Sequence, residues 1–577
     1  MPSRLPVLFT LAVVAAIAAV GIVTHSEPGD GLWFGMHAEF LPFLPVLVVG
    51  LLIAWRTRPT DAQLAPAQLS DFLMLTVVGV AAAFSAGRVW LLVVGEPVVY
   101  HDEASYLLQA ETFAAGRLTA DGLPDAPQLL DQMHVVSDEV RFSRYFPGTA
   151  IWLAPWAAIG LPRLGQVVAH VVASLLVALT GREIGSRRAG LIAGLAFGLS
   201  PGLTVFSSHL LAHHPTLIGL TLFLWQLFVA LRTGHLRSFA IAAIGLSAAM
   251  ICRPMTAAGF ALPFGVVLLR HAVHRGQWQP LAAMAAPIVA GLGLLGLHDV
   301  STTGELLTTP YSVYNARHSP RHVYGFGNGT RGDAAAALAD RGRRLAEYDQ
   351  WAANLDASLA IDNVATRCEA SLRLTLGVVP LLVALGIVLA TPPLRRVDGP
   401  LPLLVASIGS LHLVHVPYWF VGIDDWHYVL ESAVPWCLIA GLATEALAGW
   451  RPLGRWWLSV LAVAAVLNQT SLPPVWYGEQ SLSLARDAFS ISRYRDLGTF
   501  LDSYRDGRPT VVAIRKDPTQ IHFDYVRNGV SLDDAVVVLH LRTLNEIPTI
   551  ERLFPDRRIV VLDQTQPRDK QLTVVRP

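Results

Sequence analysis

A histidine and two adjacent carboxylates follow a long apolar run. Tyr100-His101-Asp102-Glu103 begins a few residues beyond the apolar stretch 72–95, which is long enough to cross a bilayer because about 20 apolar residues suffice. A carboxylate at a membrane surface can remove a proton from a bound hydroxyl, and a neighbouring polar group can orient it. We therefore predict that Asp102 is a general base oriented by Glu103 or His101. Alternatively, both acids cap the helix expected after them, since carboxylates favour helix N-termini.

Arginines follow the carboxylates in the same expected loop. Arg141, Arg144 and Tyr145 precede a second apolar stretch at 151–161. A guanidinium group binds phosphates and carboxylates through paired hydrogen bonds. The order of acids and then arginines predicts a base with an anion clamp beside it, and Tyr145 belongs to the same candidate binding group.

Three histidines share a short turn between two apolar runs. His209, His213 and His214 are predicted to hydrogen-bond a phosphate or a sugar hydroxyl, or else to cap helix ends. His209 and His213 are four residues apart and share a helical face, which is one arrangement for metal ligands. No third ligand lies nearby in the sequence, so we predict no metal site and no required cofactor, with a divalent metal as an open alternative.

Two more turns carry polar groups. Arg253 stands before Pro254 between two apolar runs, where a charge is costly without an anionic partner, and we predict that it binds a lipid phosphate. A later turn is expected to contact a sugar or an acceptor through Asp424, Asp425, His427 and Tyr428.

The composition indicates a multispanning membrane protein. The 577 residues are 53% hydrophobic and only 15% charged, and the mean hydropathy is +0.46. The formal net charge is zero, which argues against a nucleic-acid partner because such binding needs a basic face. Three cysteines predict neither a disulfide framework nor a cysteine metal site.

Apolar runs predict about 13 transmembrane helices. The candidate spans are 6–23, 39–55, 72–95, 164–181, 189–205, 215–231, 239–252, 256–271, 280–298, 371–391, 400–421, 429–448 and 456–468. The apolar stretch 148–161 is assigned to a helix at the outer interface, because counting it as a crossing would spoil the charge asymmetry of the loops.

Arginine placement predicts the orientation, since short cytoplasmic loops are enriched in positive charge. With the N-terminus inside, the short outer loops hold only Arg253, whereas the inner loops hold Arg4, Arg56, Arg58, Arg182, Arg187, Arg188, Arg232, Arg237, Arg270, Arg275, Arg395, Arg396, Arg451 and Arg455. Every candidate site residue then lies at the outer face.

Three parts are predicted along the chain. Residues 1–71 hold two N-terminal transmembrane helices, and residues 72–470 form a catalytic core with external loops 96–163 and 299–370. Residues 471–577 change to the composition of a soluble domain. Short β runs at 511–514, 536–539, 559–562 and 572–575 alternate with helical stretches there and predict a small external α/β domain.

The ordered motifs resemble a known superfamily. Asp-Glu at 102–103, Ala-x-Tyr at 104–106, Ala-Ala-Gly-Arg at 114–117 and Arg-Tyr-Phe-Pro-Gly at 144–148 are similar to those of GT-C glycosyltransferases. The nearest group is that of the protein O-mannosyltransferases and lipid A aminoarabinose transferases, and the resemblance covers mainly residues 72–300.

The resemblance implies a GT-C-like helical bundle and a polyprenyl-phosphate-sugar donor. The acceptor would be a glycan, a lipid or a protein, and the chain would lie in a bacterial inner membrane with its C-terminus periplasmic or extracellular. The rival hypothesis is a transporter or flippase for a lipid-linked sugar, which would need the same phosphate site but no base. Transporters tend to show internal repeats and broken midplane helices, whereas this chain concentrates its polar groups at one face. A non-catalytic partner in envelope assembly is a third possibility.

Overall fold

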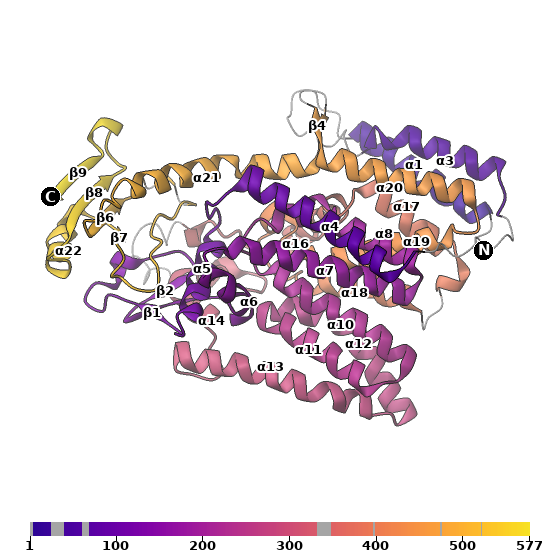
Figure 1. The fold of residues 1–577 in the computed structure, drawn as a ribbon, viewed down its shortest axis with the longest axis horizontal. Helices are drawn as coiled ribbons and strands as arrows, with labels where there is room; N and C mark the ends of the chain where they lie inside the picture. Colours follow the sequence, from indigo (N-terminus) through magenta and orange to yellow (C-terminus); the bar gives the residue numbers. More distant parts are fainter. Residues whose placement is uncertain are drawn as a thin grey trace.

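The computed structural model describes residues 4–24, 40–59, 69–331, 348–395, 399–472, 476–517, 519, 520 and 522–577. The helices run roughly along the long axis of the molecule (Figure 1). A small β-sheet lies at one end of this axis, and the N-terminus lies near the other. The candidate residues of the loop that begins after α4 lie toward the end that carries the sheet, as the label of α5 shows.

The helical bundle is built from apolar segments. Its helices are α1 (Arg4–Thr24), α3 (Phe43–Arg56), α4 (Asp71–Val89), α7 (Pro162–Ile184), α8 (Arg187–Gly198), α9 (Pro201–Phe206), α10 (His213–Thr233), α11 (Leu236–Cys252), α12 (Pro254–Arg275), α13 (Gln279–Thr303), α16 (Ala357–Arg373), α17 (Val378–Leu389), α18 (Pro400–Val414), α19 (Ala433–Ala446) and α20 (Arg451–Gln469).

Six helical segments of the described chain are long and apolar enough to cross a membrane, and a seventh is a pair bent by 87°. The six are Asp71–Val94, Pro162–Ile184, His213–Thr233, Pro254–Arg275, Gln279–Thr303 and Ile423–Ala446, and the bent pair is Ala357–Arg373 with Val378–Leu389. Four shorter apolar helices are Arg4–Val20, Phe43–Arg56, Leu236–Cys252 and Pro400–Val414. The chain is thus a multispanning membrane protein, but the count of 13 spans is not confirmed.

One expected span is not a single helix. The run 189–205 is divided into α8 and α9, because Ser200 has an extended backbone (ψ 128°) before Pro201. A residue that precedes proline avoids the helical region, so the helix must end there.

Close packing within the bundle depends on small residues. A Cβ atom on Gly219 of α10 would lie 2.5 Å from the carbonyl oxygen of Gly245 on α11, and one on Gly245 would lie 2.6 Å from that of Gly219. Small residues at a helix interface let the two backbones approach closely. By contrast, α13 exposes large apolar side chains such as Val289 and Leu297, as expected for a helix that faces lipid.

The loop after α4 carries its own short elements. They are α5 (His101–Ala114), β1 (Ala120–Asp121), η2 (Pro127–Leu130), β2 (Val135–Ser137), β3 (Val140–Ser143) and α6 (Pro147–Ala158), and the three strands form an antiparallel sheet in the order β1-β3-β2. A second polar region contributes α14 (Pro310–His318).

The C-terminal region forms a four-stranded sheet. Helix α21 (Glu479–Asp502) runs along the bundle toward this sheet (Figure 1). The strands are β6 (Thr510–Arg515), β7 (Val536–His540), β8 (Arg558–Asp563) and β9 (Leu572–Arg576), with α22 (Ile547–Leu553) between β7 and β8. Their order is β7-β6-β8-β9, parallel except for β9. A short hairpin of β4 (Ser471–Leu472) and β5 (Trp476–Tyr477) precedes α21.

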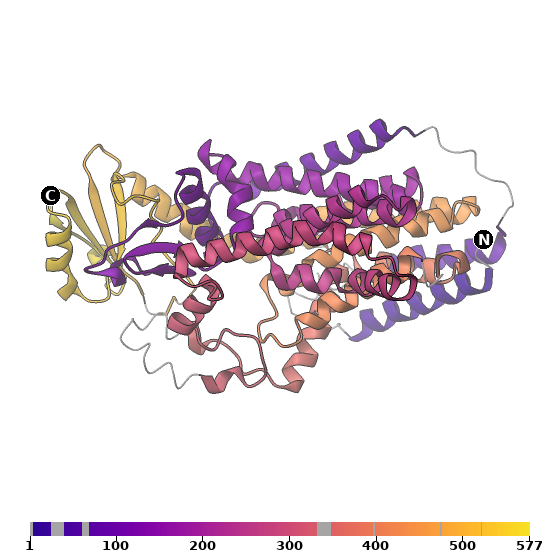
Figure 2. The ribbon, with the colours of Figure 1, turned by 90° about the horizontal axis from the view of Figure 1, so that it is seen from below.

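The C-terminal sheet packs against the loop after α4, and Figure 2 shows the two side by side. Leu129 and Leu130 of η2 share a buried apolar cluster with Val511, Val537 and Ile559 of the sheet. Polar contacts reinforce this packing: the guanidinium of Arg542 lies 2.8 Å from Asp131, and the amide of Met133 donates to Asp524. The C-terminal region therefore holds the loop with the candidate residues in place from outside the bundle.

Candidate active site

Helix α5 begins at His101, and Glu103 caps it. The carboxyl Oε1 of Glu103 accepts hydrogen bonds from the backbone N–H groups of Val99 and Tyr100, both at 3.0 Å. The capping role considered for both acids thus belongs to Glu103. Because neighbouring residues on a helix point about 100° apart, Asp102 faces a different environment.

Glu103 is fully buried within an ionic network. Its carboxyl lies 3.4 Å from the guanidinium of Arg163, accepts from the amide of Leu210 at 2.8 Å and lies 3.3 Å from Nδ1 of His209. Burial opposes ionisation, but His209 and Arg163 lower the pKa of Glu103 to about 2. Glu103 therefore does not contact Asp102 as an orienting group, contrary to one of the sequence-based alternatives.

His209 lies between two carboxylates. Its Nε2 is 3.2 Å from Asp487 of α21, and the hydroxyl of Tyr100 also donates to Asp487, at 2.5 Å. Burial disfavours the imidazolium, but Glu103 and Asp487 together raise the pKa of His209 to about 9. His209 is thus a charged link between the start of α5 and the C-terminal helix.

This link predicts a pH-dependent stability. The pKa of His209 in the folded protein is above its ordinary value of 6.5, so its contribution is fully present below pH 6.5 and is lost as the pH rises through about 9. We expect the melting temperature in detergent to fall across that window. The variant His209→Gln should melt lower at pH 6.5 and change less toward pH 9. A wild-type melting temperature that stays constant over this range would contradict the assignment.

Asp102 faces a separate polar group. Its Oδ1 accepts a hydrogen bond from the hydroxyl of Tyr145 and lies 2.7 Å from Nδ1 of His134, while its Oδ2 makes no hydrogen bond within the described residues. The side chain is 16% exposed. One carboxylate oxygen is therefore held in place and the other is available to a bound molecule.

The charge state of this group follows from its surroundings. Burial by itself would raise the pKa of Asp102, but His134, His427 and Arg144 hold the pKa of this carboxyl well below its usual range. Burial, followed by the charge of Arg144, lowers the pKa of His134 to about 4. At neutral pH the pair is thus a carboxylate and a neutral imidazole that donates its Nδ1–H.

His134 was not predicted from the sequence. Its backbone has φ 64°, a left-handed conformation that is unusual for a residue other than glycine. The main chain is held by two hydrogen bonds to its carbonyl oxygen, from Ser105 Oγ at 2.6 Å and from the amide of Arg144 at 3.1 Å. Strained backbone of this kind is retained where the surroundings enforce it, often at functional sites. Only its position in the same loop as Arg144 could have suggested it.

Arg144 lies beside the carboxylate in an aromatic setting. Its guanidinium carbon lies 5.0, 4.8 and 5.1 Å from the ring centres of Tyr145, Tyr311 and Tyr314, and its Nη2 donates to the Tyr145 hydroxyl at 3.0 Å. Its Nε and Nη1 are buried and have no hydrogen-bond partner within the described residues. A buried guanidinium with two unused donors is a ready binding group for an anion.

Arg141 does not share this position. Its guanidinium donates to the backbone oxygens of Asp121 at 2.6 Å, Gly529 at 2.6 Å and Asn528 at 3.4 Å, and it is buried. Of the two arginines predicted to bind an anion, only Arg144 therefore remains a candidate. The reason is the alternation of β3: Arg141 and Arg144 are three residues apart and point to opposite sides of the strand and its continuation.

Arg253 already has an anionic partner within the protein. Its Nη1 lies 2.6 Å from Oε1 of the fully buried Glu431, and its Nη2 donates to the carbonyl oxygen of His427 at 2.9 Å. The counter-ion that this charge needs is thus a carboxylate of the protein itself, Glu431, which was not predicted from the sequence.

Removing Arg253 should therefore destabilise the protein. In Arg253→Ala, Glu431 would remain buried without its partner, a change that costs about 3 to 5 kcal/mol in other proteins. We expect a clear drop in the melting temperature in detergent. The double variant Arg253→Ala with Glu431→Gln should recover part of the loss, because it removes the buried charge as well. An unchanged melting temperature of Arg253→Ala would show that the pair is not formed.

The remaining predicted residues fall into two groups. Near the candidate base, His101 lies edge-on to His134 at 5.9 Å, and the rings of His213 and His427 meet at 4.5 Å, with His213 Nε2 2.8 Å from the His427 carbonyl oxygen. Tyr428 packs against Tyr418 at 4.8 Å.

Two predicted residues lie in contacts with other helices. His214 Nε2 is 3.3 Å from Nδ1 of His170 on α7, and Asp424 binds Ser483 and Arg486 on α21. Asp425 follows Asp424 in the same left-handed turn, with φ of 60° and 50° respectively. The three histidines of the 209–214 turn thus point to three different surroundings. Within the described ranges, no group of three His, Cys, Asp or Glu side chains could hold a metal ion.

Comparisons with known proteins concern the fold. No known family profile matches this sequence, and no curated protein matches it. Among solved structures, ArnT from Cupriavidus metallidurans, bound to undecaprenyl phosphate, is 12% identical with a TM-score of 0.50, and the match covers 85% of this chain and 92% of that one.

Two further structures are similar at lower scores. The Archaeoglobus fulgidus oligosaccharyltransferase is 15% identical (TM-score 0.44), and the arabinosyltransferase EmbB from Mycobacterium smegmatis is 16% identical (TM-score 0.42). These matches cover 79% and 82% of this chain, which spans 64% and 42% of their lengths. The likeness to ArnT shows that the two chains share a fold.

Proposed function

We propose that this chain, which has the fold of the GT-C superfamily, is a membrane glycosyltransferase that moves a sugar from a polyprenyl-phosphate donor to an acceptor hydroxyl or phosphate. The observation that carries the proposal is the pairing of Asp102 and Arg144 around Tyr145. A carboxylate with one free oxygen lies next to a guanidinium with two unused donors. Glycosyl transfer from a lipid phosphate needs both groups, one for the incoming oxygen and one for the departing anion.

In the proposed reaction, Asp102 accepts the proton of the acceptor hydroxyl while the acceptor oxygen attacks the anomeric carbon. The bond from that carbon to the phosphate oxygen breaks, and Arg144 stabilises the negative charge that appears on the phosphate. His134 and Tyr145 hold Oδ1 of Asp102 so that Oδ2 faces the acceptor. A single displacement inverts the configuration at the anomeric carbon.

The other candidate residues receive more limited roles. Arg253 is neutralised by Glu431, so we assign most of the phosphate binding to Arg144 and only a longer-range contribution to Arg253. His213, His427 and Tyr428 are proposed to contact the sugar or the acceptor.

The proposed base distinguishes a glycosyltransferase from the rival transporter. A transporter for a lipid-linked sugar would use a phosphate site but would have no use for a held carboxylate with a free oxygen. Purified protein in detergent should release polyprenyl phosphate from a panel of radiolabelled polyprenyl-phosphate sugars when an acceptor is added. Movement of the intact lipid across proteoliposomes without any cleavage would instead support the transporter and reject the transferase.

The orientation is part of the same proposal. The arginine asymmetry of the short loops assigns the N-terminus to the cytoplasm and the C-terminal sheet to the outer side. A reporter that is active only in the cytoplasm should be silent when it is fused after Pro577. The same reporter fused after Arg58, in an expected inner loop, should be active, and the opposite pattern would reverse the assignment.

A further inference from the structure

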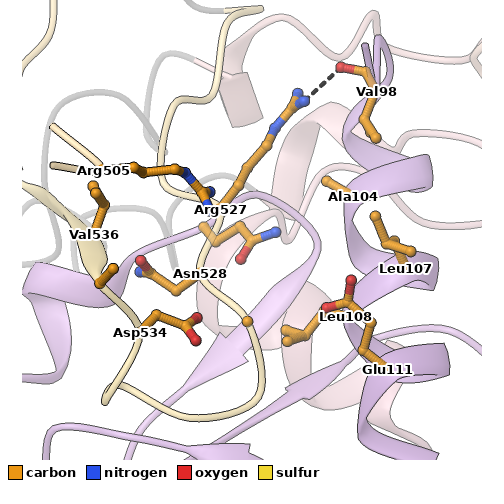
Figure 3. Close-up of a pocket in the computed structure, with 13 residues that line it drawn as sticks. Val98, Ala104, Leu107, Leu108, Glu111, Arg505, Arg527, Asn528, Asp534 and Val536 are labelled. Atoms are coloured by element: carbon orange, nitrogen blue, oxygen red, sulfur yellow. Dashed lines mark hydrogen bonds between the residues drawn. The ribbon is translucent and has the colours of Figure 1, made fainter. Parts of the chain in front are cut away.

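A cavity of about 320 Å³ lies between helix α5 and the C-terminal sheet. Figure 3 shows that its wall is formed on one side by residues of α5 and on the other by Arg505 and the segment that leads into β7. Glu111 and Leu107 line it from α5, while Arg505, Arg527 and Asp534 line it from the C-terminal region. The cavity belongs to neither part alone and exists only because the two are packed together.

The cavity is distinct from the Asp102 group. Glu111 follows Asp102 by nine residues on the same helix, which is two and a half turns at 3.6 residues per turn. The two side chains therefore leave α5 on opposite faces. Neither Asp102 nor Arg144 lines the cavity.

The lining has both charges in balance. Two carboxyl groups, Glu111 and Asp534, and two guanidinium groups, Arg505 and Arg527, surround the cavity, and Figure 3 shows the acids toward one side and the arginines toward the other. Such a set offers both donors and acceptors with little net charge, since Glu111, with a pKa of about 7, is partly protonated at neutral pH. It matches a neutral molecule rich in hydroxyl groups better than it matches an anion or a cation.

Several of these groups have unused hydrogen-bonding capacity. The carboxyl of Glu111 makes no hydrogen bond within the described residues, and burial raises its pKa to about 7. Oε1 of Gln132, a residue only 4% exposed, is buried and has no partner there either. Buried polar groups are normally satisfied by protein, water or ligand. Leu107 and Leu108 add an apolar surface of the kind that ligand pockets combine with a few polar groups.

We propose that this cavity binds a short segment of neutral oligosaccharide. Hydroxyl groups would donate to Glu111 and Asp534 and accept from Arg505 and Arg527, while a sugar face would lie on Leu107 and Leu108. The inference rests on the proposed function only for its biological meaning, as a subsite for a glycan acceptor. The binding itself needs neither the donor nor Asp102.

The experiment measures saccharide binding to the full-length protein in detergent, without donor lipid. The probes are neutral trisaccharides of glucan, mannan, galactan and arabinan type, detected by saturation-transfer NMR and titrated for Kd. We expect at least one to bind, and Glu111→Gln and Ala535→Trp each to weaken it by roughly tenfold or more. Ala535 lines the cavity and is exposed, so the larger side chain can fill the cavity without disturbing a core.

Matched variants separate the possible outcomes. Asp556→Asn, an exposed acid of the C-terminal region outside the cavity lining, should bind the trisaccharide as wild type does. Asp102→Asn should also retain binding, even if glycosyl transfer proves to be the wrong reaction. The inference is overturned if no probe binds with a Kd below about 10 mM. It is equally overturned if both cavity variants bind like wild type, or if Asp102→Asn alone abolishes binding.

Discussion

The variant Asp102→Asn is expected to fold, to bind donor and to lose turnover by roughly 10² to 10⁴, the usual contribution of a positioned general base. Asparagine keeps the size of the side chain and can still accept the hydrogen bond from Tyr145 through its amide oxygen. It cannot take the acceptor's proton at neutral pH. The measurement is the release of radiolabelled polyprenyl phosphate, together with the melting temperature and donor binding of the same preparation.

Glu103→Gln is the matched control for this prediction. It changes the adjacent carboxylate in the same chemical way, but the structure places Glu103 among Arg163, His209 and the backbone of the helix start. We expect Glu103→Gln to melt at a lower temperature than wild type. When turnover is measured below the melting temperature, its loss should be much smaller than that of Asp102→Asn. Near-normal turnover in Asp102→Asn would end its assignment as the base, and a selective loss in Glu103→Gln would transfer that role.

Arg144→Gln should have the second largest effect. Removing one preorganised group that stabilises a developing negative charge typically lowers turnover by about 10² to 10³. Because Arg144 has two unused donors, we also expect weaker binding of the donor lipid. Arg144→Lys should recover only part of both losses, since an ammonium lacks the planar pair of donors.

Arg117→Gln provides the comparison for Arg144. It removes a guanidinium from the same loop, but Arg117 is 41% exposed and pairs with Asp121 at the surface. Its turnover and donor binding should match wild type. If Arg144→Gln binds donor as tightly as Arg117→Gln does, Arg144 is not the phosphate group and the proposed mechanism loses its electrostatic component.

The sequence predicted the parts of the site that depend on local order. The apolar run before Asp102, the start of a helix there and the nearness of Arg144 to a second helix follow from composition and spacing, and the structure has α4, α5 and α6 in those places. The strands of the C-terminal region lie where β-branched runs stand in the sequence. The resemblance to GT-C enzymes rested on short motifs rather than on a physical pattern.

Long-range partners were beyond what the sequence could predict. Arg141 and Arg144 are equivalent in type, and only the course of β3 and the position of residues 528 and 529 decide which one meets Asp102. His134 belongs to the site, but its backbone has a left-handed conformation that the local sequence does not predict. Glu431 and Asp487 looked like ordinary acids, because nothing in their neighbouring sequence shows that each meets a cation more than 170 residues away.

The bond between Tyr100 and Asp487 has a consequence for the order of events during synthesis. The two residues are 387 positions apart in the chain. At a translation rate of 5 to 20 residues per second, roughly 20 to 80 s separate their emergence from the ribosome. During that interval the loop with Asp102 already exists, but neither its link through His209 to α21 nor its cover by the C-terminal sheet has been made. A nascent chain therefore carries an unfinished candidate site, and the geometry around Asp102 is complete only after α21 and the sheet have docked.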